Sequence, residues 1–269
     1  MSQDLSFSNL IKSTGVGAQQ VIAPTLSFAL GFAVAVGILV WAGGALPGGT
    51  VGSVVFPILV FATLYMRCLF SAAMYNALLV PAGPVSRTGL QLVWAWLLII
   101  VVAAIMATII LLFFSLIGSS LGVAATESGQ NITDMTQQMR EGGTFYPLFA
   151  LFILTLLGVA WFAARIMLFS VATVAQGHVH VFRTWYWTKG HVRTLLPGAL
   201  LFVVLPFAAC AGFANAALGL LALEMQTPVQ AGLGAALAAL CLTPAAWLGH
   251  AFSAAIYQRL APAPESANA

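Results

Sequence analysis

The sequence predicts an all-α integral membrane protein with six transmembrane helices, on the basis of three observations. Of its 269 residues, 61% are hydrophobic and only 6% are charged, whereas soluble domains carry about 25% charged residues. Six apolar runs reach the length of about 20 residues that a helix needs to cross the hydrocarbon core of a bilayer. No Asp or Glu lies inside any of these runs. We therefore expect the bilayer to be the solvent of a single transmembrane domain, residues 1–269.

The six runs are separated by more polar segments of different lengths. Their expected bounds are 25–46, 54–80, 91–121, 146–175, 195–221 and 231–257. Because several runs exceed the minimum length, we expect the helices to tilt or to extend beyond the hydrocarbon core.

Residues 1–24 precede the first run and do not have the composition of a secretory signal. Asp4 and a mixture of Ser, Gln and Asn occupy the place where a basic segment would lead into an apolar core. Four residues nevertheless recur at helical spacing, namely Phe7, Leu10, Ile11 and Thr14. Two interpretations remain open for this segment: a short helix on the membrane surface or a frayed tail.

Lys and Arg residues between the runs fall almost entirely on one side of the predicted membrane. That side receives Lys12, Arg87, Arg183, Lys189, Arg193 and Arg259, and the other side receives only Arg140. Because basic loops stay in the cytoplasm, we expect both termini and the segment 176–193 to be cytoplasmic. The loop 122–144 is then extracytoplasmic. In a Gram-negative bacterium the membrane would be the inner membrane.

A weak internal repeat involves three Phe-Ser pairs, at 70–71, 169–170 and 252–253. One ionisable residue precedes each pair: Arg67, Arg165 and His250. The pattern predicts three helical hairpins with a common plan. Another Phe-Ser pair at 114–115 and the abundance of Ala leave chance as the alternative.

The segment after the fourth run combines aromatic and basic residues, and residues 181–190 read VFRTWYWTKG. We expect a helix that lies in the interface from His178 to Lys189 and stops at Gly190. Its apolar face would contain Val181, Phe182, Trp185 and Tyr186, and its headgroup face His180, Arg183, Thr184 and Thr188. Trp187 completes the set of interfacial aromatics. The alternative is that these aromatics only anchor the ends of helices and bind no ligand.

Five residues of this segment resemble a known signature: Arg183, Trp185, Thr188, Lys189 and Gly190. The signature, Arg-Ser-Trp-x-Leu-Thr-Arg/Lys-Gly, is that of the bacterial glycerophosphoryl diester phosphodiesterase membrane domain and the related YciC-like group. Thr184 stands where Ser is usual, and Trp187 where Leu is usual. The resemblance implies a six-helix inner-membrane protein of a family whose function is mostly unassigned. It does not imply phosphodiesterase activity, because the acidic metal-binding pairs of the catalytic domain are missing from this sequence.

Two arginines, Arg67 and Arg165, lie inside apolar runs that offer no carboxylate partner. A guanidinium at membrane depth costs about 2.5 kcal/mol or more, so it is normally solvated, paired or functional. One interpretation is that both side chains extend to the headgroups. The other is that they bind an anionic headgroup or substrate. In that case we expect the ligand-binding residues to be Arg67, Arg165, Arg183 and Lys189, with Arg165 sharing its anion with Arg183 or Lys189.

We expect no catalytic residues, metal site or cofactor. The sequence lacks a P-loop, an H-E-x-x-H motif and a G-x-S-x-G motif. On a helix, His178 and His180 would point to different sides and could not share a metal. His250 and Ser253 share a helical face and could hydrogen-bond, but no acid would orient the histidine.

The expected function is therefore that of a non-catalytic integral membrane protein with a structural or accessory role. It would bind anionic membrane lipids or a protein partner, including a second copy of the chain. The alternative is a transporter or channel for a small or amphipathic anion, with Arg67 and Arg165 at its site. A membrane-embedded enzyme would need a cavity that joins two or more histidines with a Ser or Thr. Nucleic acid is not an expected partner, because no dense basic stripe exists.

Overall fold

The structure, a computed structural model, describes residues 7–46, 49–79, 83–120, 140–141, 143, 145–221 and 227–261. Every regular element in these ranges is helical. Six stretches are long and apolar enough to cross a membrane: Phe7–Ala45, Thr50–Leu78, Val85–Leu116, Phe145–Gln176, Val192–Leu220 and Pro228–Leu260. The predicted all-α, six-helix membrane protein is therefore confirmed. Most of the predicted loop 122–144 lies outside the described residues.

The chain divides into two compact units, which we describe separately. One unit contains residues 96–163, from Trp96 to Ala163. It comprises most of α3 (Val85–Ser120) and of α5 (Phe145–Ile166). Large apolar side chains cover the outside of this unit, among them Leu111, Leu116 and Leu157. Helices that are apolar on every side require an apolar solvent, which only a bilayer or another protein can supply.

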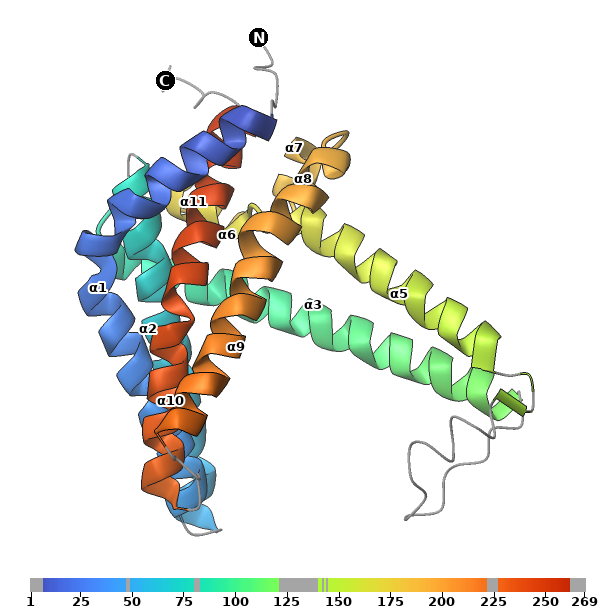
Figure 1. The fold of residues 1–269 in the computed structure, drawn as a ribbon, viewed down its shortest axis with the longest axis horizontal. Coiled ribbons are helices and arrows are strands. Elements are labelled where there is room, and N and C mark those ends of the chain that lie inside the picture. Colours follow the sequence, from blue (N-terminus) through green and yellow to red (C-terminus); the bar gives the residue numbers. More distant parts are fainter. Residues whose placement is uncertain are drawn as a thin grey trace. The chain divides into compact units, whose positions relative to one another are not determined.

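The other unit contains residues 1–95 and 164–269. In it, α1 (Phe7–Ala45) lies beside α2 (Thr50–Leu78), α10 (Pro228–Cys241) and α11 (Thr243–Leu260), and α9 (Leu205–Leu220) packs on α10 and α11 (Figure 1). A core is formed by Val21, Ala29, Phe70 and Met74, with partly buried neighbours around it. The start of α1 and the end of α11 lie at the same end of this bundle (Figure 1). We call it the basic end, because Lys12 and Arg259 lie there.

Helix α1 is longer than the predicted first span. Its 39 residues correspond to about 58 Å, compared with about 30 Å for the hydrocarbon core. Residues 7–24 are continuous with the span, so both interpretations of this segment, a separate surface helix and a frayed tail, are wrong for its described part. The physical reason is burial, because Leu10, Thr14 and Val21 are inaccessible to solvent in the bundle.

Small residues allow α1 and α10 to approach each other closely. Ala29, Ala33 and Gly37 recur every four residues on the buried face of α1. A Cβ atom added to Gly37 would lie 2.9 Å from the carbonyl oxygen of Gly232 in α10. Helices in membranes associate mainly through such close packing, because lipid gives them no hydrophobic driving force toward each other.

Three of the predicted spans are interrupted helices. The fourth is divided into α5 and α6 (Phe169–Gln176), and the sixth into α10 and α11. The fifth consists of α8 (Val192–Ala199), a π-helical turn η1 (Leu200–Val204) and α9. The π turn ends two residues before Pro206, which lacks the N–H needed to continue a regular α-helical ladder.

The three Phe-Ser pairs of the predicted repeat are all buried, in α2, α6 and α11. These three helices also contact one another pairwise. The pairs thus form part of one packed centre. Equal depth of Arg67, Arg165 and His250 in three equivalent hairpins stays a prediction.

Candidate functional site

The aromatic and basic segment is folded differently from the predicted interfacial helix. Helix α6 ends at Gln176, because Gly177 adopts the left-handed conformation with φ of +68°. The next helical residues are only Thr184–Trp187, the single turn α7. Gly190, with φ of +85°, follows three residues later. The prediction of one helix from His178 to Lys189 is therefore wrong, since Gly177 ends the preceding helix and starts a turn.

Threonine side chains hold this segment from the inside. The hydroxyl of Thr184 donates to the carbonyl of Val181 at 2.8 Å. The hydroxyl of Thr188 lies 3.0 Å from the carbonyl oxygen of Arg165, to which it can donate. Both threonines and Val181 are buried. The predicted placement of Thr184 and Thr188 toward headgroups, and of Val181 toward acyl chains, is thus incorrect, because buried backbone carbonyls need these donors.

Arg165 is buried, with 5% of its surface exposed. Its guanidinium carbon lies 4.7 Å from the ring centroid of Trp185, a cation–π contact. Trp185 is half-buried, and its ring supports Arg165. The placement of Trp185 toward acyl chains stays a prediction. Arg183 and Lys189, the predicted partners of Arg165 at a shared anion, have exposed side chains. A lipid phosphate at Arg165 stays a prediction.

The outside of the segment carries two exposed aromatic rings and three exposed cations. Phe182 is 49% exposed and Tyr186 is 76% exposed. The side chains of Arg183, Lys189 and Arg193 are also exposed. We call these five residues the aromatic–basic surface. Trp187, the remaining predicted interfacial aromatic, is half-buried and packs edge-on against Tyr257 of α11, with 5.9 Å between ring centroids.

His178 and His180 lie side by side, with 5.5 Å between ring centroids and an angle of 27° between ring planes. The expectation that they point apart is wrong, because residues 179–180 are not helical. Burial lowers the pKa of His180, and the charges of His178 and Arg183 lower it further. Within the described part of the chain, no group of three or more metal-binding side chains occurs.

His250 pairs with Ser71 of α2, not with Ser253 as the helical spacing suggested. Its Nδ1 lies 2.7 Å from the Ala246 carbonyl oxygen and its Nε2 lies 3.0 Å from the Ser71 hydroxyl. Because a carbonyl only accepts, Nδ1 carries the proton, and Nε2 of the neutral ring accepts from Ser71. Ser253 instead donates to the carbonyl of Gly249 at 2.9 Å.

This Ser71–His250 pair connects α2 to α11 through a partly buried hydrogen bond. It brings one histidine to one serine, whereas the enzyme hypothesis required two histidines and a cavity. The ring of Tyr75, 4.9 Å from the imidazole, packs against the same histidine. Arg67 lies one helical turn before Ser71 and has an exposed side chain.

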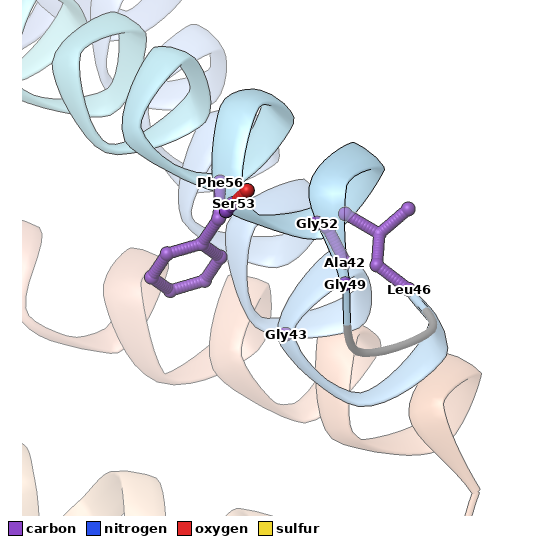
Figure 2. Close-up of a pocket in the computed structure, with 7 residues that line it drawn as sticks. All are labelled: Ala42, Gly43, Leu46, Gly49, Gly52, Ser53 and Phe56. Atoms are coloured by element: carbon purple, nitrogen blue, oxygen red, sulfur yellow. The ribbon is translucent and has the colours of Figure 1, made fainter.

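Two hollows lie at opposite ends of the α1–α2 hairpin. Figure 2 shows the hollow of about 370 Å³ near the turn between these helices, which is lined by Ala42, Gly43, Leu46, Gly49, Gly52, Ser53 and Phe56. None of these side chains is charged, and the Ser53 hydroxyl already donates to the Thr50 carbonyl. This hollow therefore offers little to a charged ligand.

The other hollow, of about 480 Å³, is at the basic end. It lies between the first turns of α1, the end of α2 and the end of α11, and it includes Lys12 and Arg259. Sequence reasoning counted both cations in the topology but did not predict them as site residues. The sequence did contain a signal for this pair. In a chain with six spans, the start of the first helix and the end of the last helix lie on the same side of the membrane.

Comparisons of the chain with protein-family models, curated proteins and solved structures found no match. The resemblance to the phosphodiesterase membrane domain and YciC-like group therefore rests on the short signature alone. The structure gives these signature residues distinct roles. Trp185 packs against Arg165, Thr188 bonds to the Arg165 carbonyl, and Gly190 adopts the left-handed conformation of a turn. Arg183 and Lys189 have exposed side chains.

Proposed function

We propose that this chain is an integral membrane protein with a structural or accessory role, which binds anionic lipid headgroups without catalysis. The observation that carries this proposal is the aromatic–basic surface, where Phe182, Tyr186 and three cations of the same short segment are all exposed. Aromatic rings favour the depth of the membrane interface. Guanidinium and ammonium groups at that depth can donate to lipid phosphates.

Local charge supports this proposal. Between residues 164 and 221 the sequence contains four Lys or Arg residues and no Asp or Glu. A cation near an anionic membrane surface contributes about 1 kcal/mol of binding free energy. With both termini in the cytoplasm, this surface would meet the anionic leaflet, and in a Gram-negative bacterium that leaflet belongs to the inner membrane.

The fixed backbone of the segment also supports the proposal. Gln91 donates a hydrogen bond to the Gly177 carbonyl, and Gln176 donates to the Tyr257 hydroxyl at 3.3 Å. Together with the bond from Thr188 to Arg165, these contacts hold the start and the end of the segment. A surface that is already ordered loses less conformational entropy when it binds a ligand.

Spin-labelled lipids test the proposal by electron paramagnetic resonance. The protein is reconstituted in phosphatidylcholine with a trace of spin-labelled phosphatidylglycerol or phosphatidylcholine, and the ratio of their association constants is measured. Replacing Arg183, Lys189 and Arg193 by Gln should lower this ratio, by roughly fivefold for each cation that contacts a headgroup. An unchanged ratio in the triple variant would refute lipid binding at this surface, and would leave a protein partner as the alternative occupant.

A further inference from the structure

The groove at the basic end is built from three helices that are distant in the sequence. Its walls come from the first turns of α1, from Leu78 at the end of α2, and from α11. The floor consists of small apolar residues, including Gly17 and Ala251. A Cβ added to Gly17 would lie 3.2 Å from Leu78 Cδ2 and 3.3 Å from Ala251 Cβ, so the helices are already in close contact beneath the groove.

The rim of the groove is cationic. Lys12 and Arg259 contribute the charges, and none of the described residues that line the groove is acidic. The Nη1 atom of Arg259 is buried and has no hydrogen-bond partner among the described residues. A buried guanidinium nitrogen without an acceptor is costly, because it has lost its water and gained no replacement. An anionic oxygen in the groove would supply that acceptor.

The combination of cationic rim and apolar floor identifies the ligand class. We propose that the groove binds one phospholipid with a single anionic phosphate, held between Lys12 and Arg259. One acyl chain then extends over Val16, Gly17 and Ala251. A volume of about 480 Å³ falls within the usual range for small-molecule sites, about 300–1,000 Å³. A free phosphate would leave the apolar floor uncovered, so the lipid is the better match.

This inference rests on the proposed anionic-lipid function but involves different residues. The segment that carries the aromatic–basic surface contacts α11 through Trp187 and Tyr257. The groove begins at the next residues of α11, Gln258 and Arg259. Loss of lipid from one site therefore does not require its loss from the other. The aromatic–basic surface would select many exchanging lipids, whereas the groove would retain one.

Native mass spectrometry counts the retained lipid. The protein is incubated in mixed micelles with dioleoyl phosphatidylglycerol or dioleoyl phosphatidylcholine, diluted into lipid-free detergent and sprayed. Wild-type protein should keep one phosphatidylglycerol. The Lys12→Gln/Arg259→Gln variant should lose it, with Kd raised by roughly tenfold or more. Val16→Trp should also prevent retention by blocking the groove, because Val16 is an exposed lining residue.

Matched variants separate the groove from general effects. Ile11→Trp places the same ring on an exposed position of α1 that does not line the groove, and it should keep the lipid. Arg183→Gln/Lys189→Gln also removes two charges and should keep it. If wild-type protein retains no phosphatidylglycerol, or retains phosphatidylcholine equally well, the groove proposal is overturned. Retention by the Val16→Trp variant would overturn it as well.

Discussion

The guanidinium of Arg165 lies over the ring of Trp185, 4.7 Å from its centroid. The two residues belong to different elements, α5 and α7. The contact explains how a charged side chain can be buried at the end of an apolar helix. It also changes the role of Trp185, which supports an internal cation while Phe182 and Tyr186 remain exposed.

Replacing Trp185 by Leu should destabilise the bundle, because it removes the aromatic face beneath Arg165. The cation–π contribution is about 0.5–2 kcal/mol, and Trp185→Phe should retain part of it. The free energy of unfolding can be measured by titration with sodium dodecyl sulfate in mixed micelles. Tyr186→Leu is the matched control, since Tyr186 is highly exposed, and it should change the free energy of unfolding little. Equal losses in both variants would show that the contact contributes nothing specific.

Substitution of Gly232 should weaken the contact between α1 and α10. A Cβ at this position would lie 2.8 Å from the carbonyl oxygen of Gly37 and 2.9 Å from Trp41 Cβ. We expect Gly232→Ala to lower the free energy of unfolding by about 1–3 kcal/mol, the usual cost of overpacking. Gly212→Ala is the control, because a Cβ there meets nothing within 4 Å. A neutral Gly232→Ala variant would mean that the two helices are not this close.

The hydroxyl of Ser71 should be energetically coupled to His250. Hydrogen bonds between membrane helices contribute about 0.6 kcal/mol on average and up to about 1.7. A double-mutant cycle of Ser71→Ala with His250→Phe should give a coupling energy in this range. The same cycle with Ser253→Ala should give a smaller value, because the Ser253 hydroxyl donates to Gly249 within its own helix. A larger coupling energy with Ser253 than with Ser71 would contradict this result and would favour the pairing of His250 with Ser253.

His180 should titrate below the reference pKa of histidine, about 6.5. Burial is the main cause, and His178 and Arg183 add electrostatic repulsion of the protonated form. Because the unfolded segment binds the proton more readily, stability contributed by neutral His180 is present above pH 6.5 and declines as pH falls below it. Nuclear magnetic resonance of labelled histidines measures the pKa. Arg183→Gln should raise the pKa of His180. If Lys189→Gln raised this pKa equally, the cause would be the overall positive charge of the segment and not Arg183 in particular.

The fold class could be predicted from composition and from the length of the apolar runs, because a bilayer imposes both. The segment 176–193 could not be predicted equally well. Helical periodicity placed Thr184 and Thr188 toward headgroups, but both side chains bond inward to carbonyls. The decisive residue was Gly177, whose left-handed conformation ends α6. Gly177 lies six residues before Arg183, the first residue of the signature, and nothing around it in the sequence indicates a left-handed conformation.

The candidate sites show the same limit. The sequence identified Arg183, Lys189, Phe182 and Tyr186 through their composition, and these side chains are exposed. It could not identify the partners of Arg165 and His250, because a cation–π contact and an interhelical hydrogen bond depend on how the helices pack. The same reason applies to Lys12 and Arg259, which are 247 positions apart and share one groove.

The chain contains only two lysines, Lys12 and Lys189, and this permits a direct test of lipid binding. In the Lys12→Gln variant, a ¹⁵Nζ-lysine label reports on Lys189 alone. Solid-state nuclear magnetic resonance then measures ¹⁵N–³¹P dephasing in phosphatidylglycerol bilayers. We predict dephasing that corresponds to a nitrogen–phosphorus distance of about 4 Å, as expected for an ammonium hydrogen-bonded to a phosphate oxygen. Absence of dephasing at Lys189 under conditions where lipid motion is frozen would contradict anionic-headgroup binding at the aromatic–basic surface.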